Sequence, residues 1–172
     1  MGRRAIRPLA EPASGNAMTT ASLFTIGLLG TAFAAMAVAV VSDIRRRIIP
    51  DETVGVVAVA GVATRFLQLD VLAVGTSLAA ALVLMLALGQ LSRFRVFGAG
   101  DAKLVAAASL LQPIAAIPSL LLYVALAGLP VALGCIAWNL LPRASAAKIR
   151  TVPYGLAILL GALVLNLAEV LR

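Results

Sequence analysis

The stretch that decides the fold is residues 71–91, VLAVGTSLAAALVLMLALGQL, which contains no charged residue. A helix needs about 20 apolar residues to cross the hydrocarbon core of a bilayer, and this run is long enough. The whole chain has the same character, since 62% of its 172 residues are hydrophobic and 12% are charged. Soluble domains are about half apolar and about a quarter charged. The sequence therefore predicts an all-α membrane protein.

Working outward from this run, similar apolar segments predict a polytopic bundle of about six transmembrane helices. Residues 1–17 are polar and rich in Pro, Ala and Gly, which predicts a disordered tail. We expect a single membrane-embedded domain over 18–172, and Met18 is an alternative translation start. The predicted spans cover approximately residues 21–41, 53–69, 71–91, 96–111, 115–140 and 153–170.

The formal net charge of +7 does not indicate a nucleic-acid partner, because the basic residues lie in short clusters between apolar runs. Three alternate loops, 42–52, 92–103 and 141–152, carry most of these residues. The positive-inside rule places such loops in the cytoplasm and therefore both termini outside. The arginines of the tail oppose this orientation, and a start at Met18 would remove them.

Two aspartates stand out among the seven acids of the chain. Asp43 ends the first predicted span and Asp101 begins the fourth, so the predicted topology puts both at one depth on the cytoplasmic side. An acid at the centre of a span costs about 2.5–3.5 kcal/mol on insertion scales. Acids in or beside a span are therefore candidate functional residues.

Two carboxylates in one partly dry site cannot both ionise cheaply, so the pair titrates as a unit if the first and fourth helices are neighbours. One charged and one protonated carboxyl is the arrangement that an aspartic protease uses. The charged member takes a proton from water, and the neutral member donates a hydrogen bond to the scissile carbonyl. The chain has no histidine and one cysteine, so it offers no CxxC pair for zinc.

The residues around these aspartates have two interpretations each. Gly98 and Gly100 allow unusual backbone angles and close approach beside an extended peptide, or they serve close helix packing. Lys103 is either a cytoplasmic anchor or a helper that holds charge near Asp101 or docks a lipid or substrate group. Asp51 and Glu52 follow Pro50 and are typical of a helix N-terminus.

The chain resembles the type IV prepilin peptidases, which are membrane aspartic proteases of the GxGD kind. Residues 98–103, GAGDAK, match their GxGD-x-K motif, and residues 43–50, DIRRRIIP, match an aspartate followed by a basic stretch and Ile-Pro. Residues 152–161, VPYGLAILLG, are similar to the motif of their last span. The small size resembles the short CpaA/TadV kind, linked to Flp (tight-adherence) pili. The family usually has Asn where this chain has Asp51.

The resemblance implies that Asp43 and Asp101 are the catalytic dyad of an endopeptidase in the bacterial inner membrane. Its substrate would be a prepilin, with a basic leader on the cytoplasmic side followed by an apolar helix in the bilayer. The pilus-assembly machinery would be a further partner, and neither a metal nor an organic cofactor is needed. Longer relatives also methylate the new N-terminus, but we find no motif for that transfer, so methylation stays undecided and its absence is favoured. Motif support is assigned to Gly98, Gly100, Lys103 and Pro50, and substrate docking to Asp51 and Glu52.

Two other functions remain open from the sequence. A proton-coupled membrane carrier would use paired acids as a relay, and it predicts polar residues along a path to both sides of the membrane. A noncatalytic pilus-assembly subunit would keep the fold, and it predicts that loss of either aspartate leaves prepilin processing intact.

Overall fold

The structure is a computed structural model that describes residues 20–68, 71–94, 98–140 and 153–170. These residues form helices and short connections, without a strand, so the predicted all-α fold is confirmed. The predicted tail over 1–17 and the basic loop 141–152 lie outside the described residues. The elements are α1 (Thr20–Arg46), α2 (Asp51–Gln68), α3 (Val71–Arg93), α4 (Ala99–Ser109), η1 (Ile114–Ala116), α5 (Ile117–Leu140) and α6 (Tyr154–Val170).

Three helical segments of the described chain are long and apolar enough to cross a membrane: Ser22–Arg46, Val74–Arg93 and Ile114–Leu140. Tyr154–Ala168 is apolar but shorter. With 11 residues, α4 is about 16 Å long, which is about half the thickness of the hydrocarbon core. The predicted fourth span is therefore a helix in the expected place that does not cross the bilayer on its own, and the count of about six spans stays a prediction.

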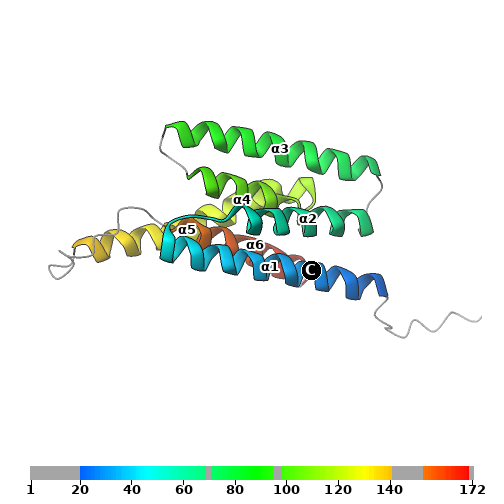
Figure 1. The fold of residues 1–172 in the computed structure, drawn as a ribbon, viewed down its shortest axis with the longest axis horizontal. Coiled ribbons are helices and arrows are strands. Elements are labelled where there is room, and N and C mark those ends of the chain that lie inside the picture. Colours follow the sequence, from blue (N-terminus) through cyan, green and yellow to red (C-terminus); the bar gives the residue numbers. More distant parts are fainter. Residues whose placement is uncertain (1–19, 69–70, 95–97, 141–152, 171–172) are drawn as a thin grey trace, which may run out of the picture.

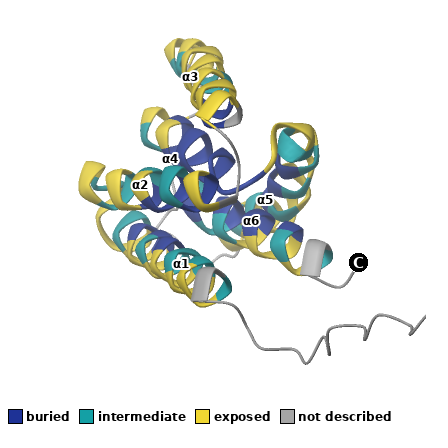
Figure 2. Ribbon diagram, turned by 90° about the vertical axis from the view of Figure 1, so that its right-hand side faces the viewer, coloured by how far each residue is buried: buried dark blue, intermediate teal, exposed yellow. Residues whose placement is uncertain are grey.

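The helices pack in layers around α4 (Figures 1 and 2). α3 lies on one side of α4, while α2 and α6 lie on the other, between α4 and α1. α5 packs mainly against α6. α1 and α4 are thus held together through α2 and α6, and they are not the close neighbours that the sequence analysis assumed.

α4 is the most buried element because its small side chains let three helices approach it. Alanines occupy four of its buried positions, and Leu104 is fully buried among them. Fully buried Met36, Val57 and Ile158 bring α1, α2 and α6 into the same core. Large apolar side chains on the outer faces of α1, α3 and α5 are exposed, as expected for helices that face lipid. The core therefore fixes the position of α4 relative to the helices around it.

The end of α4 is fixed by a buried arginine of α2. The last carbonyls of a helix lack partners within the helix. Arg65 is 5% exposed; its Nε donates to the Leu110 carbonyl at 3.3 Å and its Nη2 to the Leu111 carbonyl at 2.9 Å. A Cβ on Gly61, one helical turn earlier, would lie 2.7 Å from the Leu110 Cβ, so glycine is required for this close approach. Arg65 therefore contributes to packing between α2 and α4.

The link from α1 to α2 folds back sharply over the start of α4. α1 ends at Arg46, and the next residue, Arg47, has a left-handed φ of 58°. The Arg47 N–H donates to the Asp43 carbonyl at 3.0 Å. Such a left-handed residue is a common way to end a helix. The Ser42 hydroxyl donates to the Ile48 carbonyl at 2.8 Å and so holds the link against α1. This turn brings Ile49 onto Gly100 of α4, and Ile49 and Asp43 line the same cavity.

We expect the substitution Arg65→Met to lower the free energy of unfolding by about 1.5–3 kcal/mol, because two buried carbonyls lose charged donors. The apolar part of the side chain is kept, so packing changes little. Thermal unfolding in detergent micelles measures the effect. The matched control is Arg93→Met, at an exposed helix end, which should change stability by less than about 0.5 kcal/mol. Equal effects of the two substitutions would contradict this role of Arg65.

Candidate active site

Asp43 and Asp101 line one cavity of about 330 Å³ at one end of the helical bundle. One wall is formed by the end of α1 and the link after it, including Arg47, Ile48 and Ile49. The opposite wall is the start of α4, residues 98–101, with Lys103 two positions further on. The shared cavity arises because both helices place their ends at the same level, although other helices lie between them. A reactant in this cavity can therefore lie between the two carboxyl groups.

Asp101 is 9% exposed and lies in the first turn of α4, which is not one of the three membrane-crossing segments. Burial, and to a smaller extent the neighbouring charge of Asp43, raise the pKa of the Asp101 carboxyl to about 7, while a backbone hydrogen bond with Gly98 opposes this shift. Burial disfavours the charged form of a carboxyl group, and so does a second carboxylate nearby. Near neutral pH, Asp101 therefore holds a proton much of the time.

Close contacts, rather than backbone conformation, explain the two glycines before Asp101. Gly98 has φ −73° and ψ 138°, and no glycine of the described chain has a positive φ, so the expectation of unusual backbone angles is wrong. A Cβ on Gly98 would overlap the Asp101 carboxylate, whose Oδ2 lies 2.4 Å from that position. A Cβ on Gly100 would lie 3.2 Å from the Ile49 Cβ. Gly98 makes room for the carboxyl group, and Gly100 makes room for the link above it.

Asp43 is held by a residue to which the sequence analysis gave no role. The Gly155 N–H, in the first turn of α6, donates to Asp43 Oδ2 at 3.2 Å. This glycine belongs to the stretch VPYG, which was noted only for its resemblance to a motif. The contact joins residues that are far apart in the sequence, so periodicity and composition could not reveal it. The motif at the start of the last predicted span was the only available signal for this residue.

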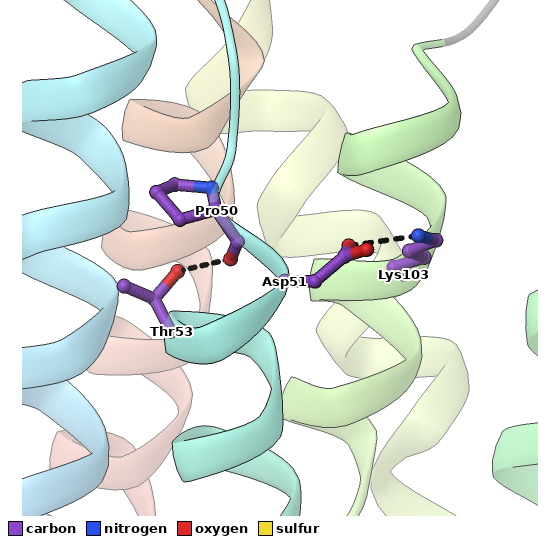
Figure 3. A network of polar contacts seen from close by, with 4 residues as sticks. All are labelled: Pro50, Asp51, Thr53 and Lys103. Carbon is purple, nitrogen blue, oxygen red and sulfur yellow. Dashed lines mark hydrogen bonds and ion pairs between the residues drawn. The ribbon is translucent and has the colours of Figure 1, made fainter.

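Asp51 and Lys103 form an ion pair between the starts of α2 and α4, with 2.7 Å between Nζ and Oδ1 (Figure 3). The side chains are 74% and 46% exposed, respectively. Both residues also line the cavity. The structure therefore gives Lys103 a charged partner on α2, and it gives Asp51 a hydrogen bond strengthened by charge.

Pro50 and Glu52 lie beside the cavity without lining it. The Pro50 carbonyl accepts hydrogen bonds from the Thr53 hydroxyl at 2.7 Å and from the Thr53 N–H at 3.2 Å, as Figure 3 shows for the hydroxyl. Pro50 thus precedes α2 and helps to begin it. Glu52 is exposed in the first turn of α2, where an acid is favourable. Neither residue contributes to the cavity wall.

The acids whose side chains the structure describes all lie at the end of the bundle where α1 stops and α2 and α4 begin. Exposed arginines 45–47 lie at the same end. A proton relay through paired acids would continue toward the other side, and the side chains that the structure describes include no acid there. Within the same part of the chain, no three Asp, Glu or Cys side chains are grouped so that they could hold a metal ion.

Comparison with known families places the chain in one of them. The sequence model of the type IV leader peptidase family matches residues 20–133. The match includes both aspartates and the ion pair, and it ends before α6. No curated protein and no solved structure matches the chain.

We expect the Asp51–Lys103 pair to contribute little to stability, because both side chains are substantially exposed. A double-mutant cycle with Asp51→Asn and Lys103→Met should give a coupling energy of at most about 1 kcal/mol, and added salt should weaken it. Thermal unfolding of the four proteins in detergent measures this coupling. A salt-independent coupling of several kcal/mol would contradict a solvent-exposed pair.

Proposed function

Since the chain belongs to the type IV leader peptidase family, we propose that it is an aspartic endopeptidase that cleaves the basic leader from prepilins of the Flp (tight-adherence) type. Asp43 and Asp101 are its catalytic dyad in this proposal. The observation that carries it is the single cavity lined by both carboxyl groups. The family match supports leader-peptidase activity, and the cavity supports the choice of these two acids.

The proposed mechanism uses the difference between the two environments. Asp101, whose carboxyl is buried and has a raised pKa, carries the shared proton and donates a hydrogen bond to the scissile carbonyl oxygen. Asp43 acts as the base that takes a proton from the attacking water. The water oxygen bonds to the carbonyl carbon, the carbon–nitrogen bond then breaks, and the leaving amine receives a proton from the dyad. Water and two carboxyl groups are sufficient for this hydrolysis.

The charges around the cavity support a substrate whose cut site lies at the membrane surface. The basic cluster at residues 45–47 favours the cytoplasm for this end of the bundle. A prepilin would place its basic leader there and its apolar helix in the bilayer. Arg47 and Lys103 line the cavity and would repel such a leader, whereas exposed Asp51 and Glu52 offer acidic groups for docking it. In the cell, the pilus-assembly machinery would receive the processed pilin.

Co-expression with a candidate Flp-type prepilin tests the dyad. We expect Asp43→Asn and Asp101→Asn each to reduce cleavage by at least about 100-fold, because each removes one half of the acid–base pair. Gel mobility of the prepilin measures processing. The control is Thr31→Val, which removes a hydroxyl that bonds within α1 and should leave cleavage intact. Persistent cleavage in either aspartate variant would refute that residue's assignment and favour a noncatalytic subunit.

We also expect a bell-shaped dependence of the cleavage rate on pH. Above a pH of about 7, Asp101 loses the proton that its raised pKa retains, so the rate should fall as pH rises through that value. A mechanism that needs one charged and one protonated carboxyl also loses rate at acid pH, because its base is then missing. Initial rates with purified protein and prepilin in detergent measure the profile. A rate that stays constant from acid to alkaline pH would be inconsistent with a shared proton.

A further inference from the structure

The start of α6 is the part of the fold that contacts the Asp43 carboxyl group. The Gly155 N–H is among the first donors of the helix, which have no partner within it. It donates to Asp43 Oδ2 at 3.2 Å, so the contact joins α1 to α6 at the cavity. This hydrogen bond reaches the Asp43 carboxylate from another helix.

The residue at 155 must be small for this contact to form. A Cβ built on Gly155 would lie 3.2 Å from Asp43 Oδ2 and 3.6 Å from the Asp43 Cβ. The first distance is shorter than an ordinary contact, so any larger residue would push the carboxylate aside by a few tenths of an ångström. Gly155 is buried, and the three atoms nearest to such a Cβ all belong to Asp43.

α6 is itself held firmly, so the start of the helix cannot easily move to accommodate Asp43. A Cβ on Gly161 would lie 2.7 Å from the Val124 backbone nitrogen, which shows how closely α5 and α6 approach. Ala157, Ile158 and Ala162 of α6 are fully buried. The position of the Gly155 N–H is therefore set by helix packing, and the carboxylate adjusts to it.

The two carboxyl groups of the cavity thus have the same kind of support. Each packs against the backbone of one glycine, Asp101 against Gly98 and Asp43 against Gly155. Gly98 lies three residues from its aspartate in the same segment, whereas Gly155 comes from the far end of the chain.

We propose that Gly155 is a positioning residue, whose backbone N–H and missing side chain hold the Asp43 carboxylate in the orientation that hydrolysis requires. The inference rests on the proposed function, because it assigns Asp43 a part in the reaction. In this role Gly155 acts through Asp43, to which its N–H donates. A displacement of about 1 Å can reduce the rate of an enzyme about 100-fold, so a shift of a few tenths of an ångström is enough to matter.

The kinetic test compares graded substitutions at this glycine with one at a neighbouring glycine. We expect Gly155→Ala to reduce kcat about tenfold and Gly155→Val about 100-fold, with KM changed less than about twofold. Gly128→Ala is the matched control, because its Cβ would make an ordinary 3.5 Å contact with Tyr154, the residue before Gly155, and it should keep wild-type kcat. Wild-type kcat in Gly155→Val, or an equal loss in Gly128→Ala, would overturn the inference.

A spectroscopic test does not depend on activity or on the identity of the substrate. With ¹⁵N-glycine labelling of the full chain in detergent, the Gly155 amide is assigned by its disappearance in Gly155→Ala. Asp43→Asn should shift this resonance, whereas Asp101→Asn, which leaves the hydrogen bond between Gly155 and Asp43 intact, should leave it in place. If the chemical shift of the Gly155 amide is the same in Asp43→Asn as in the wild type, the inference is overturned.

The two proposals fail in different ways. If the wild-type chain cleaves no prepilin while the Gly155 amide still responds to Asp43→Asn, the contact exists and the proposed reaction is wrong. If the wild-type chain cleaves prepilin and neither kcat nor the amide depends on the Gly155–Asp43 contact, the reaction stands and the positioning role is wrong.

Discussion

The close packing of α4 against three helices is the constraint on which the rest of the structure depends. Its alanine-rich surface lets backbones approach closely, so small residues rather than large apolar ones determine the interhelical distances. Arg65 of α2 fixes one end of α4, and Ile49, packed on Gly100, fixes the other. α2 and α6 pack against both α1 and α4. They therefore set the distance between α1 and α4, which have little direct contact. Asp43 and Asp101 reach one cavity as a result of this indirect packing.

The cavity is lined by a buried acid, Asp101, and by an exposed ion pair between Asp51 and Lys103. Asp101 is buried and has a raised pKa, whereas the Asp51–Lys103 pair beside it is open to solvent. A carboxyl group that keeps its proton near neutral pH can donate a hydrogen bond, which an ionised one cannot do. The separation of roles proposed for the two aspartates therefore follows from their surroundings, since the side chains are chemically identical.

The apolar runs predicted the positions of the helices well, because hydropathy and proline placement are properties of local sequence. They predicted a helix near 96–111, but they could not show that α4 ends after 11 residues and lies buried among other helices. Asp43 and Asp101 could be selected from the cost of acids near the membrane, and the topology placed them at one level. The contacts of Arg65 with α4 and of Gly155 with Asp43 could not be predicted, since each depends on packing between distant segments. Gly98 was selected for its backbone freedom, whereas its contact with the Asp101 carboxylate explains it better.

The gathering of the described acids at one end of the bundle has a consequence for the permeability of the membrane. A hydrolytic site at this end can draw water from the headgroup region and return its product there. The remaining length of the bundle, whose core consists of residues such as Met36, Leu104 and Ile158, can then stay dry. An enzyme arranged in this way can use water as a reactant without opening a hydrated path along which ions would leak and dissipate the transmembrane gradient.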